Sequence, residues 1–262
     1  MYARYVVGVD GSAPSNAALM WAARRAGADG LPLVIAHVEE PEGGVMGRDF
    51  ARADLRSGST LLTELAASLE GRGTDVATAL LSGFVPWALA DATRPGDLLV
   101  VGTHKTGFLH GRVLGSRSVQ IAAAARCAVA VIPDTDLRRR TGVVVGLGVG
   151  DPPTVLAAAA DEARRYGQEL SVIRSHVPSA ASLDQLSPLI DAVRTTHQGL
   201  EILTKGTRRA PVEALLDASR DKALLVIGAG EVDETGNPIG SLLHDVLLNL
   251  TCPVLVVRGT RS

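Results

Sequence analysis

Residues suited to binding an anion follow the apolar run Leu98–Val101. Glycines leave backbone N–H groups accessible, and lysine and arginine side chains add positive charge. A helix is expected to begin at Ser116, and the amino end of a helix also attracts anions. The order of strand, glycine-rich loop and helix therefore predicts a phosphate-binding site. Its candidate residues are Gly102, Thr103, Lys105, Gly107, Gly115, Ser116 and Arg117.

Alternating strands and helices must position this loop. Short apolar runs predict strands at Arg4–Val9, Leu33–Val38, Asp75–Leu81, Asp97–Val101 and Ala128–Ile132. Helical patterns between them predict helices at Pro14–Ala28, Arg48–Glu70, Val85–Thr93 and Ser116–Ala125. This alternation favours an α/β fold with an open, mostly parallel sheet and helices on both faces.

Composition and charge exclude several classes of protein. Hydrophobic residues make up 46% of the 262 residues and aromatic residues only 3%, so Val, Leu, Ile and Ala must form the core. A net charge of −2 predicts neither a nucleic-acid nor a membrane partner. Cys127 and Cys252 lack metal-ligand spacing, and no nucleophile–base set is evident, so we predict no metal site and no catalytic residues. Without an apolar leader segment, we expect a cytoplasmic protein.

The pattern of the first half begins again after residue 141. Val143–Gly146 repeats Val6–Gly8, and Leu224–Gly228 repeats Leu98–Gly102. Ser175-His176-Val177 is interpreted as the echo of Ala36-His37-Val38. We therefore predict two copies of one domain. The predicted boundaries are 1–134 for the first domain, 135–141 for a charged linker and 142–262 for the second domain.

Both copies resemble universal stress protein domains, and the chain resembles a tandem member of that family. The resemblance rests on Asp10-Gly11-Ser12, on His37-Val38 and on the pattern Gly-x2-Gly-x9-Gly-Ser/Thr from Gly102 to Ser116. It implies five-stranded parallel sheets of the adenine nucleotide alpha hydrolase-like, or Rossmann-like, type. It also implies ATP, as Mg-ATP, at the carboxyl ends of the strands, where open α/β sheets bind ligands.

The resemblance assigns roles to residues of the first domain. Asp10 faces the nucleoside, Val38 meets the base through backbone atoms, and Gly8 lies beside them. A second interpretation stays open, in which Asp10 forms an Asx-turn and the glycines serve only as turns. Lys105 replaces a motif glycine, so it either pairs with a phosphate or obstructs the pocket.

The second copy departs from the binding pattern. Gly148 stands in the place of Asp10 and removes a carboxylate. Glu231 stands in the place of Lys105, with further acids following it, and these would repel phosphates. We therefore expect ATP, or a related adenine nucleotide, mainly in the first domain.

Three functions remain open from the sequence. The first is a nucleotide-binding regulatory protein of the stress response, and the second is a structural module for dimerisation or partner docking. The third is a slow ATPase, which the missing catalytic set disfavours. By resemblance, the last strands Ala128–Ile132 and Val254–Val257 pair to make a pseudo-dimer within one chain. A homodimer and an unidentified client protein are also compatible with this arrangement.

Overall fold

A computed structural model describes residues 2–40, 57–103, 116–137, 139–148, 151–175, 186–230 and 240–258. Its chain divides into two compact units, the first of Met1–His104 with Ser116–Asp134 and the second running from Thr135 to Ser262. Within the described ranges, no helix is long and apolar enough to cross a membrane.

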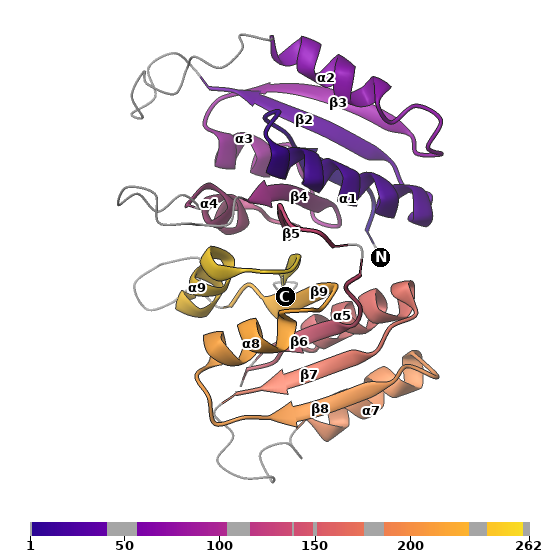
Figure 1. Cartoon of the computed structure of the whole chain (residues 1–262), viewed down its shortest axis with the longest axis vertical. Coiled ribbons are helices and arrows are strands. Elements are labelled where there is room, and N and C mark those ends of the chain that lie inside the picture. The colour runs from indigo at the N-terminus through magenta and orange to yellow at the C-terminus, as the bar shows by residue number, and fades with distance from the viewer. Residues whose placement is uncertain are drawn as a thin grey trace. The chain divides into compact units, whose positions relative to one another are not determined.

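The first unit is a five-stranded sheet in the order β3-β2-β1-β4-β5 (Figure 1). Every strand pair within it is parallel. Its strands are β1 (Tyr5–Gly8), β2 (Leu33–Glu39), β3 (Val76–Ser82), β4 (Leu98–Thr103) and β5 (Ala128–Pro133). Its helices are α1 (Ala13–Asp29), α2 (Gly58–Ala67), α3 (Val85–Asp91) and α4 (Ser116–Ala124). The predicted helix over 48–70 is confirmed over α2, and residues 48–56 lie outside the described part of the chain.

Helices cover both faces of this sheet, as predicted. A Cβ atom added to Gly8 on β1 would point at Leu89 of α3. One added to Gly102 on β4 would instead point at Pro14 of α1. Because successive residues of a strand face opposite sides, and Gly8 is level with Val101, α1 and α3 lie on opposite faces.

The second unit repeats this topology in the strand order β10-β9-β6-β7-β8, again all parallel. It corresponds to β5-β4-β1-β2-β3, so the predicted repeat is confirmed as a repeat of fold. Its strands are β6 (Val143–Gly146), β7 (Leu170–Arg174), β8 (Ile202–Gly206), β9 (Leu224–Gly228) and β10 (Val254–Val257). Its helices are α5 (Pro153–Tyr166), α7 (Ser187–Thr196), α8 (Pro211–Ser219) and α9 (Ser241–Asn249).

The register of the second unit corrects one part of the predicted repeat. Gly8 is level with Ala36, and Gly146 is level with Ile173. Arg174 therefore takes the place of His37, and His176, which lies outside the described residues, does not. The alignment expected from sequence similarity is therefore wrong by two positions, because the register is set by strand pairing.

Each unit's last strand lies at an edge of that unit's own sheet, as predicted. Pairing of these two strands with each other stays a prediction, as does the assignment of residues 135–141 as a linker.

The glycine at position 102 should be essential for stability. An alanine Cβ there would lie 2.3 Å from the Pro14 carbonyl oxygen and 2.7 Å from the Ser15 nitrogen, both backbone atoms. Gly102→Ala should therefore lower the free energy of unfolding by about 2–3 kcal/mol. Urea denaturation of the intact chain measures this loss.

Gly228→Ala, at the corresponding position of the second unit, is the matched control. Its Cβ would meet the side-chain atoms of Asp151 at 3.1 Å and Val155 at 3.3 Å, and side chains can shift. We expect a loss below about 1 kcal/mol. If Gly102→Ala and Gly228→Ala lowered the free energy of unfolding equally, the clash with backbone atoms would not explain the need for glycine at position 102.

Candidate functional site

The predicted binding residues that the structure describes lie at the carboxyl edge of β2, β1 and β4. These strands are neighbours and parallel, and the chain leaves β1 toward β2 on one side while β4 lies on the other. Asp10, two residues beyond Gly8, is level with Val38 and with Thr103 by the register of both pairs. A change of winding direction of this kind is where open α/β sheets form a crevice.

The turn between β1 and α1 holds Asp10 through a local hydrogen bond. The backbone N–H of Ser12 donates to Asp10 Oδ1 at 2.9 Å. Gly11 has φ +80°, a conformation that favours glycine, and Ser12 caps α1 by accepting from the Ser15 N–H. The Asx-turn interpretation of Asp10 is thus realised. The residue is also exposed at the surface.

The end of β2 is tied to β1 by His37. Its Nδ1 lies 2.8 Å from the carbonyl oxygen of Val9, which explains an imidazole at the end of an apolar strand. Alternate residues of β2 face β3, beginning with Leu33, whose N–H donates to Asp75. The backbone of Val38 therefore faces β1 and the Asp10 turn, as a contact to a base through backbone atoms requires.

Packing accounts for two of the predicted glycines. Gly102 allows the end of β4 to approach the backbone of α1, and Gly8 leaves room for Leu89, 2.9 Å from its added Cβ. Beside Gly102, the buried hydroxyl of Thr103 accepts from Ser118 Oγ on α4 at 3.4 Å. A phosphate contact by these residues stays a prediction, because the packing by itself explains why they are glycine.

An ion pair spans this edge. Arg117, in the first turn of α4, donates to Glu40 Oε2 at 2.9 Å, and Glu40 directly follows β2. The pair thus connects segments that follow the two strands flanking β1. Sequence reasoning found Arg117 and missed Glu40, because the two are distant in sequence. Lys105, Gly107, Gly115 and the side chain of Ser116 lie outside the described residues.

In the second unit a carboxylate lies at the corresponding edge. Asp151 Oδ2 accepts from the Gly148 N–H at 2.6 Å, and Oδ1 is 3.1 Å from the Cβ position of Gly228. Asp151 therefore lies between the ends of β6 and β9, where its charge opposes an anion. Sequence reasoning missed it because its neighbours, two prolines, resemble a helix start. Glu231 lies outside the described residues.

The two cysteines are buried thiols at matching positions of the repeat. Burial raises the pKa of Cys127, although a hydrogen bond with Thr93 opposes the shift. Burial raises the pKa of Cys252 to about 11. Neither thiol is ionised near neutral pH, and within the described ranges no cluster of three His, Cys, Asp or Glu side chains could hold a metal ion.

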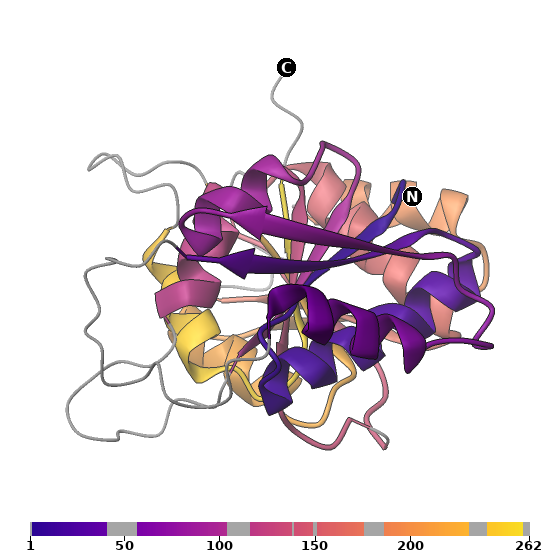
Figure 2. The same ribbon diagram turned by 90° about the horizontal axis from the view of Figure 1, so that it is seen from above.

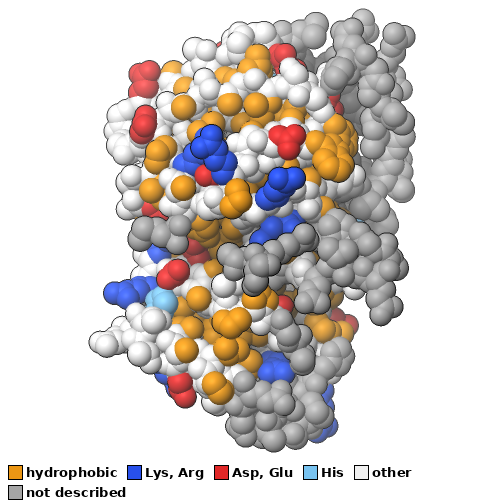
Figure 3. Space-filling model, turned by 180° about the vertical axis from the view of Figure 1, so that it is seen from behind, with side chains coloured by type: hydrophobic (Ala, Val, Ile, Leu, Met, Phe, Trp, Pro, Cys, Tyr) orange, Lys and Arg blue, Asp and Glu red, His pale blue; other side chains and the backbone are white. Residues whose placement is uncertain are grey.

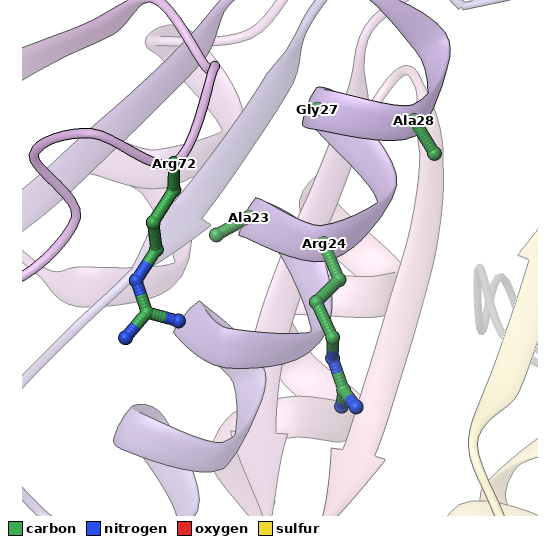
Figure 4. Close-up of a pocket in the computed structure, with 5 residues that line it drawn as sticks. All are labelled: Ala23, Arg24, Gly27, Ala28 and Arg72. Carbon is green, nitrogen blue, oxygen red and sulfur yellow. The ribbon is translucent and has the colours of Figure 1, made fainter.

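Two surface hollows lie away from these residues. One of about 300 Å³ adjoins the second half of α1, where Arg24 and Arg72 lie on either side of Ala23 (Figure 4). Its four residues from α1 follow the middle of that helix, and Arg72 comes from the turn after α2, so the hollow is remote from the carboxyl edge, where α1 begins. The other hollow, of about 190 Å³, lies beside α8 in the second unit. It is lined by Ile173, Lys205, Thr207, Arg209, Ala214, Asp217 and Ala218.

Comparison with known proteins gives consistent matches. The model of the universal stress protein family matches residues 1–133. A universal stress protein of Mycolicibacterium smegmatis is 27% identical, with 97% of this chain and 96% of the relative aligned. One from Mycobacterium tuberculosis is 28% identical over the same shares.

Solved structures match the fold over the whole chain. The crystal structure of a universal stress protein from Archaeoglobus fulgidus has a TM-score of 0.72 at 16% identity and covers 98% of this chain and 99% of its own. A functionally unknown protein from Pseudomonas aeruginosa has a TM-score of 0.68 at 18% identity, covering 98% of this chain and 92% of its own.

Both thiols should resist alkylation in the folded chain. With a pKa of about 11, Cys252 is about 0.1% thiolate at pH 8, whereas an unperturbed thiol is about one quarter thiolate. We expect iodoacetamide to label the native chain at least about 100-fold more slowly than the urea-unfolded chain. Because both pKa values are raised, the protection should persist as the pH rises from 7 to 9. Equal labelling rates in the two states would contradict this.

Proposed function

Because the chain belongs to the universal stress protein family, we propose that its first unit binds an adenine nucleotide at the carboxyl edge of β2, β1 and β4. ATP is the nucleotide we expect. The observation that carries the proposal is the convergence of Asp10, the Val38 backbone and Arg117 at one change of winding direction. The proposed role is regulation within a stress response.

Each group at this edge suits one part of a nucleotide. The exposed Asp10 carboxylate can accept hydrogen bonds from ribose hydroxyls. The Val38 backbone offers a donor and an acceptor to the base. Arg117 and the amino end of α4 bring positive charge to the phosphates, as helix ends do in other nucleotide sites. Mg²⁺ would enter with the triphosphate, since we assign it no protein ligand.

The second unit is proposed not to bind the nucleotide. It has Gly148 in place of the Asp10 carboxylate, and the Asp151 carboxylate lies between the ends of its β6 and β9. A phosphate there would meet a negative charge at short range. The two units therefore share a fold and differ in the charge at the edge.

Binding without turnover is the simplest form of this proposal. His37, the histidine described at this edge, is engaged by the Val9 carbonyl oxygen rather than by a hydroxyl or thiol. The Val9 carbonyl oxygen can only accept, so His37 Nδ1 is the donor and Nε2 is the nitrogen that could take up a proton. Within the described residues, no hydrogen bond joins His37 to a hydroxyl or thiol that it could activate. We therefore propose a regulatory binding protein in preference to an ATPase.

Nucleotide released from the purified chain tests the proposal. Acid denaturation should release an adenine nucleotide, or calorimetric titration should detect ATP binding to the emptied chain. Asp10→Ala and Gly115→Val should each abolish binding. Gly240→Val, the matched change in the second unit, should leave it nearly unchanged, since no described atom beyond its chain neighbours lies within 4 Å of its Cβ position.

Two outcomes would count against this assignment. A Gly240→Val effect as large as that of Gly115→Val would place nucleotide in both units. Absence of any bound or titratable nucleotide would leave a docking module as the remaining function.

Glu40 should weaken ATP binding because it competes with the phosphates for Arg117. The two side chains are 35% and 58% exposed, so the pair is worth about 0.2–1 kcal/mol. Glu40→Gln should therefore tighten ATP binding by up to about 5-fold and leave adenosine binding unchanged. Raising the salt concentration should reduce the gain.

Asp191→Asn provides the control for Glu40→Gln, because it removes the acid of an exposed ion pair with Arg194 in the second unit. It should not alter ATP binding. Weaker ATP binding by Glu40→Gln would contradict the proposal that Glu40 competes with the phosphates for Arg117.

A further inference from the structure

The outer edge of β3 exposes regularly spaced backbone groups. The Leu33 N–H donates to Asp75 at 2.8 Å, and the Gly83 N–H donates to Glu39 at 3.1 Å. With the β2–β3 register, these two bonds show that odd-numbered residues of β3 direct their N–H and C=O groups at β2. Even-numbered residues therefore direct theirs outward. These residues are Val76, Thr78, Leu80 and Ser82.

This edge lacks the features that usually prevent strand pairing. Val76–Ser82 is seven residues long and contains neither a charged residue nor a proline. Thr78, Leu80 and Ser82 are exposed, Leu80 to 47%. In Figure 2, which looks at this edge from above, β3 lies in front of β2 with α2 to one side. Among the described residues, helix α2 thus lies against a face of the strand and leaves its edge uncovered.

The corresponding edge of the second unit is protected. Its strand β8 is five residues long, carries Lys205 and ends at Gly206. Glu201 precedes the strand, and Arg208 follows it two residues after its end. Short length and charge are the means by which edge strands avoid pairing. The two edges thus have the same place in the fold and opposite properties.

Exposed aromatic side chains accompany the open edge. Phe84 and Trp87 follow β3 and are 50% and 64% exposed. Aromatic residues form only 3% of the chain, so two at the surface beside one strand are unusual. Figure 3 shows hydrophobic side chains exposed between charged ones on the face seen from behind.

We propose that the outer edge of β3 pairs antiparallel with β3 of a second copy of the chain, about a two-fold axis at Ala79. The outward-facing residues then match one another, with Val76 opposite Ser82 of the second copy and Thr78 opposite Leu80 of the second copy. Each matched pair exchanges two backbone hydrogen bonds. This proposal is independent of nucleotide binding.

The sequence of the strand suits a two-fold pair. At the axis, Ala79 faces Ala79 of the second copy in a non-hydrogen-bonded pair, where Cα atoms come within about 4.5 Å and a small side chain fits. The register places no charged residue opposite its like. It also brings Thr74 of the second copy, and with it the turn between α2 and β3, beside Phe84.

A second copy is favoured over an extended peptide because the edge is self-complementary. The same set of outward-facing residues serves both partners, which is the condition for an isologous contact. Pairing also covers both open edges at once, whereas a bound peptide would itself present a new edge.

A cysteine cross-link tests the register directly. Ala79→Cys should form a disulfide-linked dimer on mild oxidation, because the Cα separation at the axis falls within the range of about 4.4–6.8 Å that a disulfide requires. Ala77→Cys, on the same face of the strand, should not, because it lies opposite Leu81 of the second copy. The buried native thiols should not interfere. Equal cross-linking of the two variants would overturn the proposed register.

Sedimentation tests the association itself. We expect the dimer of the intact chain to weaken by about 10- to 100-fold in Leu80→Lys and in Thr78→Pro, because the two-fold axis doubles each loss. Position 78 suits proline because its N–H faces outward and takes no part in pairing with β2. Leu203→Lys is the matched control, since Leu203 on β8 is also 47% exposed. It should leave association unchanged.

A chain that remained monomeric at concentrations up to about 100 μM would overturn the proposal, since specific dimers form well below this concentration. A dimer that remained intact in both Leu80→Lys and Thr78→Pro would also overturn the proposal, because that dimer would have to use another surface.

Discussion

The approach of β4 to the start of α1 is the constraint on which the site depends. Gly102 has no side chain, so the strand end passes close to the Pro14 carbonyl and the Ser15 nitrogen. This approach fixes where α1 begins, and Ser12, which caps the helix, donates its N–H to Asp10. The position of the carboxylate therefore follows from the packing of two backbones. A glycine required by packing and an acid proposed for binding are parts of one arrangement.

Most of the fold could be predicted because parallel strands covered on both faces are continuous apolar runs. Leu98–Val101 and Leu224–Ile227 are such runs, and both are buried strands. The functional site was harder to predict from the sequence. Glu40 and Arg117 form an ion pair only because β2 and β4 flank β1. Asp151 lies beside Gly228, which comes from a strand much later in the chain. Contacts between residues distant in sequence leave no local pattern. The misaligned Arg174 has the same cause, because register is set by strand pairing rather than by sequence similarity.

The two units share one fold but differ in the residues at their strand ends and in their outermost strands. Their strand orders are identical, and their helices α1 and α5 both end in a glycine with positive φ, Gly30 and Gly167. The differences lie where the strands end and at the outermost strand. The interior of a sheet must retain its packing, whereas its ends and edges face solvent or partners and can change without loss of the fold. In this chain, the second unit has Asp151 at its strand ends in place of the Asp10 carboxylate, and Lys205 in its outermost strand.

The central position of β1 also governs the order in which the first sheet can form. Tyr5 pairs with Leu33 on one side and with Leu98 on the other, so its second neighbour comes about ninety residues later in the chain. During synthesis, β1 and β2 are complete long before β4 leaves the ribosome, because β2 ends at Glu39 and β4 begins at Leu98. Until then β1, an uncharged strand, is an edge without a partner. A nascent chain of this topology must hold its central strand open for several seconds at ordinary rates of translation. Completion of β4 is therefore the event that ends its exposure to aggregation.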